Sequence, residues 1–542
     1  MDEMGGHMGL DILGIAESAL SAFQVGVAVS SKNIADSSDP DYCREIVECS
    51  SMMGGELNVD VKRISDHFLG MQLYQTQAEL NKYTASSSVL SSIDQFVTGL
   101  NGSNTNGPYN LITQNMQNFF DSLNTLSTSI NDSTKESVIS QANLLASTLK
   151  GASDYVNQQK DNTDLNISNT VSQINSLTQQ IAILNEKFEK VSGTPSPDLL
   201  DQRDKLVSQL SQYVGIRTSE VNGMTNVSLM NGSSLVGGTS VSKIGVQHDP
   251  FENKTDITLS GSVLSSPETL SGTLAGLVDT RNNLIPKIQE KIGLFSATLI
   301  AAFNKQNAAG YVSANTHGGN IFQPVSSEGV AANGNQGNAQ LSVTIDPANI
   351  GNLEATSYTV TQIGTGQYQV TNDATGVITS GFTSFPISIN GLTIAETSGA
   401  MHDGDSFKID PLAQAASSIS VAAGPNDIAL SDQSDGTGNG NINALANLAN
   451  QKIFAGSTNS FSGQLGNIFA DIGTMTSGSS QSLGSAKAAY TQASNDKQSL
   501  SGVNTQEEYT NIIHFQQSYA AAAKVITVDQ QMFTTMLSVL GD

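Results

Sequence analysis

Apolar positions repeat every seven residues at both ends of this chain. The N-terminal series is Leu13, Leu20, Val27 and Ile34, and the C-terminal series is Ile512, Tyr519, Ile526, Phe533 and Leu540. A seven-residue repeat, about 3.5 residues per turn, keeps one stripe of a helix against a partner helix. We therefore predict a helix at each end of the chain, each packed against another helix.

Helical and strand patterns alternate between these two ends. Apolar residues at helical spacing predict helices over 67–97, over 111–213 with short breaks, over 272–307 with a kink at Pro286, and over 443–454, 461–476 and 486–500. Short runs of alternating apolar and polar residues, separated by Gly and Asn turns, predict strands over 216–264 and 318–411. The order along the chain is therefore helix, β, helix, β, helix.

This order predicts an α+β multidomain protein. We expect the N- and C-terminal parts to form one elongated, discontinuous helical bundle with all-β lobes inserted into it. The expected domains are a terminal coiled-coil assembly domain (8–64 and 501–542), a helical bundle domain (65–215, 268–312 and 425–500), a small β region (216–267) and an inserted β domain (313–424).

Composition narrows the classes of partner. Charged residues make up only 13% of the 542 residues, about half the usual share, and the net charge is −25. With this charge and no cluster of Lys and Arg, we predict that the chain binds neither nucleic acid nor anionic lipid. The start of the chain lacks the basic residues and unbroken apolar core of a cleaved secretory signal. Because no run of 18 or more apolar residues occurs, we also predict no membrane insertion.

Candidate catalytic and metal-binding groups are few and scattered. The two cysteines, Cys43 and Cys49, provide neither a disulfide framework nor a four-ligand metal site, and the six histidines lack ligand spacing. Asp403-Gly404-Asp405 is an incomplete calcium motif that we interpret as a solvated hairpin turn. We predict no catalytic residue, no cofactor and no metal.

The terminal helices carry apolar residues outside the seven-residue series as well. A two-helix hairpin would leave Ala16, Phe23, Phe515 and Met536 exposed, which suits a site between neighbouring copies of the chain. The predicted assembly interface therefore consists of both series together with two of these residues: Leu13, Leu20, Phe23, Val27, Ile34, Ile512, Phe515, Tyr519, Ile526, Phe533 and Leu540.

Motifs near both ends resemble those of the bacterial flagellar axial proteins. Asn33-Ile34-Ala35 followed by Tyr42-Cys43-Arg44 is similar to the N-terminal signature of that family, and Ser501-Gly502-Val503-Asn504 with the segment 507–526 is similar to its C-terminal segment. Residues 198–207 and 443–448 resemble the hook–filament junction members of the family. This chain has Asp41, Cys43 and Glu45 where the family has Gly, Ser or Thr, and Gln.

The resemblance implies a structural role without catalysis. It implies export through the flagellar type III apparatus without a cleaved signal peptide, guided by an export chaperone that recognises the C-terminal segment. It also implies a ring of copies, placed outside the cell between the hook protein and a second junction protein.

Two alternative interpretations remain open. The chain could be another axial polymer subunit, a hook or filament protein. Alternatively, the inserted β domain could be a binding or enzymatic module carried by the helical part.

Overall fold

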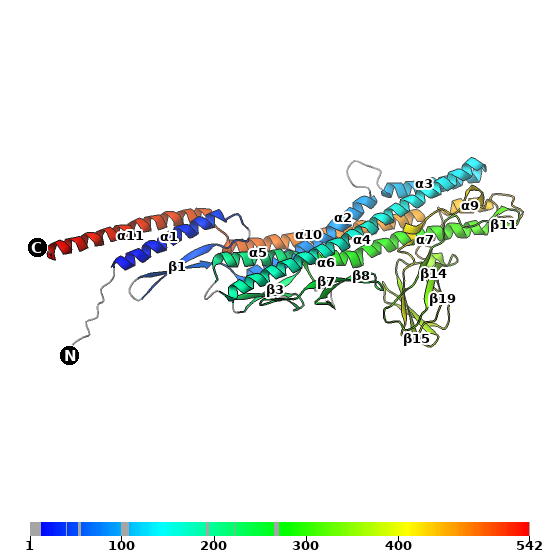
Figure 1. Cartoon of the computed structure of the whole chain (residues 1–542). Coiled ribbons are helices and arrows are strands. Elements are labelled where there is room, and N and C mark those ends of the chain that lie inside the picture. The colour runs from blue at the N-terminus through cyan, green and yellow to red at the C-terminus, as the bar shows by residue number, and fades with distance from the viewer. Residues whose placement is uncertain are drawn as a thin grey trace.

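The protein is an elongated rod with paired terminal helices at one end and a β lobe on one side (Figure 1). The computed structural model describes residues 12–39, 41–52, 56–98, 108–190, 195–221, 223–264 and 270–540. The predicted α+β class is confirmed, because helices from both halves of the chain form one long body from which the β segments are looped out.

The terminal unit consists of two helices and a β-hairpin. Helix α1 (Ile12–Ala35) and helix α11 (Thr505–Leu540) lie side by side, and strands β1 (Glu45–Ser51) and β2 (Leu57–Arg63) pair next to α1. Figure 1 shows that α11 extends beyond the start of α1. The first and last helices of the chain are thus each other's partners.

The rod is built from long helices supplied by both halves of the chain. Its helices are α2 (His67–Thr98), α3 (Pro108–Thr128), α4 (Asp132–Glu189), α5 (Pro197–Tyr213), α6 (Gly272–Asp279), α7 (Ile285–Ala309), α9 (Gly440–Asn447) and α10 (Phe461–Ser501). Helix α4 begins with a capping box between Asn131 and Thr134. The short breaks predicted within 111–213 lie between α3 and α4 and between α4 and α5. Helix α9 ends earlier than predicted.

The helix predicted over 272–307 is interrupted by a π-helical turn, η2 (Thr280–Leu284). Pro286 follows directly, at the start of α7, and has no N–H group to donate to the preceding π-helical turn. The sequence predicted a kink at Pro286, and the structure has a π-helical turn directly before this proline.

Helix α10 is one helix where the sequence predicted two. Gly and Ser between residues 477 and 485 indicated a break, yet the helix continues through them because it packs along α2. Gly466, Gly473, Gly478 and Gly484 all lie in this helix, and a Cβ atom at any of them would meet no atom within 4 Å.

Replacing these four glycines by alanine is therefore expected to stabilise α10. Each change removes backbone entropy from the unfolded chain and is worth about 0.8–1 kcal/mol, or about 3–4 kcal/mol together. Hydrogen exchange of α10 peptides would measure the gain as slower exchange. Gly276→Ala in α6 is the matched control and should destabilise, because its Cβ would lie 2.1 Å from the Lys82 carbonyl oxygen. Unchanged exchange in the fourfold variant would contradict the prediction.

The small β region follows α5, as predicted. One sheet has the order β3-β4-β5-β6 and a second has the order β7-β8-β9. Their strands are β3 (Ile216–Val221), β4 (Met224–Leu229), β5 (Ser234–Gly237), β6 (Ser240–Val241), β7 (Ile244–Asp249), β8 (Lys254–Leu259) and β9 (Ser262–Val263).

The inserted β domain, which we call the β insert, contains two antiparallel sheets of order β13-β20-β15-β16-β17 and β12-β14-β19-β18. Both sheets contribute to one shared core, as in a small β-sandwich. After the short hairpin of β10 (Tyr311–Ser313) and β11 (Thr316–His317), the strands are β12 (Ser326–Glu328), β13 (Val330–Ala331), β14 (Gln340–Ile345), β15 (Tyr358–Gly364), β16 (Gln367–Asn372), β17 (Ile378–Phe382), β18 (Ile387–Ile389), β19 (Leu392–Ser398) and β20 (Ser406–Ile409).

Asp405, from the predicted solvated turn, is instead buried at 1% exposure. Its carboxylate accepts hydrogen bonds from the backbone amides of Gln336, Gly337 and His402. Burial raises the pKa of Asp405, but these amides outweigh that effect and lower it overall. The expectation of a solvated turn was wrong for this residue, which fixes a loop of the β insert.

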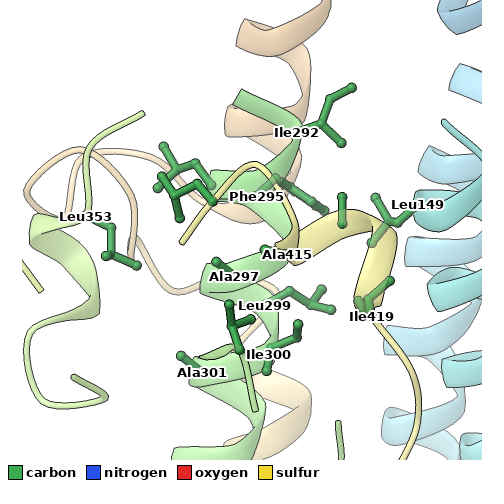
Figure 2. Close-up of a cluster of buried hydrophobic side chains, with 14 of the residues drawn as sticks. Leu149, Ile292, Phe295, Ala297, Leu299, Ile300, Ala301, Leu353, Ala415 and Ile419 are labelled. Carbon is green, nitrogen blue, oxygen red and sulfur yellow. The ribbon is translucent and has the colours of Figure 1, made fainter. Parts of the chain in front are cut away.

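Two hydrophobic cores run along the rod. The larger joins α3, the first half of α4, α7 and the β insert, and the smaller joins the second half of α4, α5, α6 and the small β region. Figure 2 shows part of the larger core, where helix α8 (Ala415–Ser418) lies between α7 and α4. Leu149, Phe295 and Ile419 bring these three segments together.

The chain returns from the β insert to the rod across α7. A Cβ atom at Gly293 would lie 1.9 Å from the Leu412 carbonyl oxygen, so only glycine allows this crossing. Glu290 lies one turn before Gly293. Burial and the carboxylate of Asp410 raise the pKa of Glu290 to about 8.

Glu290→Gln is expected to reduce the loss of stability at alkaline pH. A raised pKa means that the folded state holds a proton that the unfolded carboxyl group loses above its ordinary pKa of 4.5. Stability therefore falls as pH rises from 4.5 towards about 8, and glutamine removes this contribution. Melting temperatures between pH 6 and 8.5 should fall less in the variant, while exposed Glu136→Gln should follow the wild type. Parallel profiles for wild type and Glu290→Gln would contradict this assignment.

Candidate assembly interface

Helices α1 and α11 pack antiparallel and close together. The Gln24 side-chain amide donates to the Tyr519 hydroxyl at 3.3 Å, and the Phe515 ring lies against Gly26. A Cβ atom at Gly26 would be 2.8 Å from three ring atoms of Phe515, so the approach requires glycine. Gln24 meets Tyr519 and the later residue Gly26 meets the earlier residue Phe515, so the two helices run in opposite directions.

The residues predicted on α1 are only partly covered. Leu20, Phe23, Val27 and Ile34 are half-buried and Leu13 is 39% exposed. The buried positions of this helix carry mostly small or polar side chains, namely Ala16, Ala22, Val29, Ser30 and Asn33. Ala16 is thus buried within the chain, contrary to the expectation that it is exposed. Small side chains are buried here because they permit close contact between the helix backbones.

The residues predicted on α11 divide into two groups. Ile512, Phe515 and Ile526 are half-buried, and Tyr519 is 37% exposed while contacting α1 through Gln24. Phe533 is 65% exposed, because α11 extends beyond the start of α1. The side chains of Met536 and Leu540 lie outside the described residues. The seven-residue series therefore faces α1 over its first part only.

A second apolar stripe follows the other side of α11. Val525, Val528 and Met532 are 46%, 47% and 52% exposed, and they line a shallow groove of about 580 Å³ together with Ala520, Ala521, Lys524 and Asp529. Tyr509 and Ile513 are exposed nearer the start of the helix. We call Val525, Val528 and Met532 the outer stripe. These three residues are not among those predicted at the interface, whose C-terminal members outside the seven-residue series were expected at Phe515 and Met536.

The N-terminal motif closes the turn between α1 and β1 through Asn33, which is fully buried. Its side-chain amide donates to the Glu45 carbonyl oxygen, and its side-chain oxygen accepts from the Glu45 amide, both at 2.9 Å. The Tyr42 hydroxyl donates to the same oxygen at 2.7 Å. Asn33 thus satisfies both backbone groups of Glu45, as a neighbouring strand would.

Arg44 connects the N-terminal motif to the C-terminal motif. Its guanidinium group donates to Glu508 at 2.7 Å and to Glu507 at 2.8 Å, both at the start of α11. Its backbone amide also donates to the Ser501 carbonyl oxygen at 2.9 Å. We call residues 33, 42, 44, 45, 507 and 508 the terminal clasp. Because Glu508 is only 2% exposed, the Arg44–Glu508 pair is a fixed contact between the two ends of the chain.

Two cations attach the terminal unit to helix α5 of the rod. Lys32 pairs with Glu45 at 2.6 Å and with Asp198. Arg63, at the end of β2, pairs with Asp201 and Asp204 at 2.7 Å each. The carboxylates of Glu45, Asp198 and Asp201 lie within 4.8 Å of one another, as at a metal site, but each of them is already paired with one of these two cations.

The sequence analysis assigned no role to these contacts. The motif resemblance marked Asn33, Tyr42 and Arg44, but not which atoms meet. Charged residues are scarce in this chain, yet several gather in the two terminal motifs and in the segment 198–204. This clustering could have indicated that the three segments form ion pairs with one another.

Two of the three positions that differ from the family pattern make hydrogen bonds in or next to the turn. The amide of Asp41 donates to the Asp39 carboxylate at 3.0 Å, and Glu45 accepts from Lys32. Cys43 and Cys49 are both free thiols, the first buried and the second exposed. Burial raises the pKa of the Cys43 thiol and so keeps it neutral.

By length and composition alone, the segment Leu13–Ala35 could cross a membrane, with a mean hydropathy of 1.4. It is the one such segment among the described residues, and it qualifies the expectation of no membrane insertion. In the structure, α1 packs against α11 on one side and the β1–β2 hairpin on another, where the Leu57 amide donates to Ser18 at 3.1 Å. These contacts bury part of the apolar surface of α1.

Comparison with known proteins shows likeness over nearly the whole chain. The family described as flagellar hook-associated protein FlgK helical domain matches residues 91–322, and the flagellar basal body rod FlgEFG protein C-terminal family matches residues 498–539. Flagellar hook-associated protein 1 of Escherichia coli (strain K12) is 30% identical over 555 residues, which cover 97% of this chain and 98% of that protein. The protein of the same name in Bacillus subtilis (strain 168) is 23% identical over 561 residues, covering 98% of each chain.

A solved structure has the same fold. The flagellar hook junction protein FlgK from Burkholderia pseudomallei superposes with a TM-score of 0.68 at 22% identity, covering 80% of this chain and 100% of that one. From the combined sequence and fold likeness, the chain belongs to the flagellar hook-associated protein 1 family, whose members are structural, non-enzymatic components of the flagellum, outside the cell, at the hook–filament junction.

Proposed function

We propose that this chain forms a ring at the tip of the hook by self-assembly through α1 and α11. The observation that carries the proposal is the outer stripe, an apolar surface on the face of α11 that α1 leaves free. Apolar surface arranged in this way on an exposed helix is typical of a protein–protein contact. The occupant that we propose is a terminal helix of the neighbouring copy.

The outer stripe can contribute part of the free energy that holds neighbouring subunits together. Burying a valine or methionine side chain is worth roughly 1.5–3 kcal/mol, and about half of that remains available at residues that are half exposed. The free energy of each contact is therefore small. A closed ring repeats it at every interface, which makes the assembly cooperative.

The proposed domains separate the residues that assemble from the residues that form the body of the subunit. Residues 8–64 and 501–542 are the terminal assembly domain, whose proposed contact residues are the eleven predicted on α1 and α11 together with the outer stripe. Residues 65–215, 268–312 and 425–500 form the helical bundle, while 216–267 and 313–424 are the two β lobes. The terminal clasp joins the two ends of the chain within the assembly domain, and Lys32 and Arg63 attach this domain to α5 of the bundle.

The proposed partners are the hook protein below the ring and the second hook–filament junction protein above it. We further propose export through the flagellar type III apparatus without a cleaved signal peptide, with an export chaperone bound to the C-terminal segment. The exposed outer stripe supports the proposal of a chaperone, because an exposed apolar helix face promotes aggregation in a subunit that has not yet assembled.

Deletion of residues 505–542 is expected to abolish binding to hook tips. Purified full-length and truncated chains would be added to isolated hooks and located by electron microscopy with labelled protein. Adding the protein from outside avoids export, so a missing chaperone site cannot explain a loss. Equal labelling of hook tips by both chains would contradict assembly through α11.

The alternative of a hook or filament subunit predicts long polymers from the pure protein. Likeness to hook-associated protein 1 over 97% of the chain favours the junction subunit instead. The alternative of an enzymatic β insert has no support from the family, which is structural.

A further inference from the structure

The β insert meets the rod at several places. One is the crossing of Leu412 over Gly293. Another is the 3₁₀ turn Ile350–Asn352, where the Gly456 amide donates to the Gly351 carbonyl oxygen at 3.0 Å. A further contact runs to a part of the chain far from both connections, the turn between β7 and β8.

The β7–β8 turn is firmly attached to the rod. Arg281 lies in the π-helical turn and is only 1% exposed; its guanidinium donates to Asp164 of α4 at 2.9 Å and to the Asn253 carbonyl oxygen at 2.8 Å. Asn282 exchanges two hydrogen bonds with the backbone of Thr255, at 2.9 and 3.0 Å. The π-helical turn thus directs two successive side chains onto this hairpin.

Further contacts from α4 hold the same turn. Lys160 donates to the Asn253 side chain at 3.2 Å, and Asp164 accepts from the Thr255 hydroxyl at 2.8 Å. Asn253 has a φ of 51°, in the left-handed region that asparagine tolerates. The tip of the hairpin is therefore a rigid projection of the rod.

Lys408 joins this projection to the β insert. It lies on β20, and its ammonium group is 2.9 Å from the Glu252 carboxylate on the hairpin and 3.3 Å from the Asp373 carboxylate on the β insert. Asp373 is itself held by the hydroxyls of Ser357 and Thr359, at 2.7 and 2.8 Å. Lys408 is 15% exposed, so solvent screens this pair less than an ordinary surface ion pair.

We propose that the Glu252–Lys408 contact is a strut that sets the angle of the β insert on the rod. The crossing at Gly293, the 3₁₀ turn at 350–352 and the shared core attach the insert to the part of the rod around α7. The strut adds a point of attachment away from that region, on a hairpin that the π-helical turn fixes in place. Lys408 and Glu252 are positioning residues in this proposal, which does not depend on how copies of the chain assemble.

The test measures the distance between the β insert and the rod in the full-length chain. Spin labels would be attached through azide-bearing residues at positions 183 and 363, because Ile183 on α4 and Ile363 on β15 are both 47% exposed. Thiol labels are unsuitable because Cys49 is exposed. Pulsed electron paramagnetic resonance then gives the distance distribution for wild type, Lys408→Met, Glu252→Gln and the double variant.

Each single variant is expected to broaden the distribution at least twofold, and the double variant should be no broader than either single one. That pattern shows that both residues act through the same contact. The matched control is Lys62→Met, which removes an ion pair on the distant β1–β2 hairpin and should leave the distribution unchanged. Distributions of both single variants that superpose on wild type, or effects that add in the double variant, would overturn the proposal.

Discussion

Replacing Val525, Val528 and Met532 together by aspartate is expected to abolish binding of the chain to hook tips. The three side chains form the outer stripe on α11, about half exposed and free of contact with α1. Their burial against a neighbouring copy would contribute roughly 1–1.5 kcal/mol each, and burying three carboxylates there would cost several kcal/mol more. We expect the concentration required to label half of the isolated hook tips to rise by a factor of at least about 1,000.

The control for this variant changes the same kind of residue by the same charge. Leu144, Leu165 and Ile183 are exposed apolar residues on α4 of the rod, at 48%, 65% and 47%. Their triple aspartate variant should bind within about threefold of wild type, because a shift that small is below 1 kcal/mol. An outer-stripe variant that still labels hook tips at the wild-type concentration would contradict the assembly role of this face.

Asn33→Ala is expected to release α11 from the N-terminal segment without unfolding the rod. Asn33 is fully buried and satisfies the amide and carbonyl groups of Glu45 as well as the Tyr42 hydroxyl. Alanine leaves these groups unpaired, and a loss of about 3 kcal/mol follows from a cost of roughly 1–3 kcal/mol per unsatisfied group. Because Arg44 lies next to this turn, its contact with Glu508 should loosen as well.

Hydrogen exchange by mass spectrometry measures this effect directly. Peptides covering 41–48 and 505–512 should exchange about 100-fold faster in the variant, which corresponds to roughly 3 kcal/mol, while peptides of α4 stay unchanged. Asn143→Ala is the matched control, since Asn143 is exposed on α4 and donates only to the Ile139 carbonyl oxygen of its own helix. Equal protection of 505–512 in wild type and Asn33→Ala would show that the clasp does not hold the two ends together.

The terminal helices and the alternation of helical and β segments follow from the sequence, because apolar spacing is a local property. The pairing face of α1 does not, since its contact depends on Gly26 and on small residues that carry little hydrophobic signal. The clasp could be predicted only in part. A motif indicates that Asn33 and Arg44 matter, but the partners Glu45, Glu507 and Glu508 are chosen by tertiary packing.

Helix α10 and the π-helical turn show the same limit. Gly and Ser residues in α10 favour a loop locally, and packing along α2 overrides that preference. The π-helical turn places Arg281 and Asn282 on the β7–β8 hairpin, a contact between segments that no local pattern connects. The outer stripe was missed for another reason: a second apolar face was expected on the C-terminal helix, but at Phe515 and Met536 and not at Val525, Val528 and Met532.

The central claim is that the outer stripe of one copy lies against a terminal helix of the next copy. A photo-crosslinking amino acid at position 528, in cells that assemble flagella, tests it most directly. After irradiation, the proposed assembly predicts a covalent adduct of two copies, with the crosslink in peptides of α1 or α11 of the second copy. A strong crosslink found only to the long helices of the same copy or to another protein, with no adduct of two copies, would contradict assembly through this face.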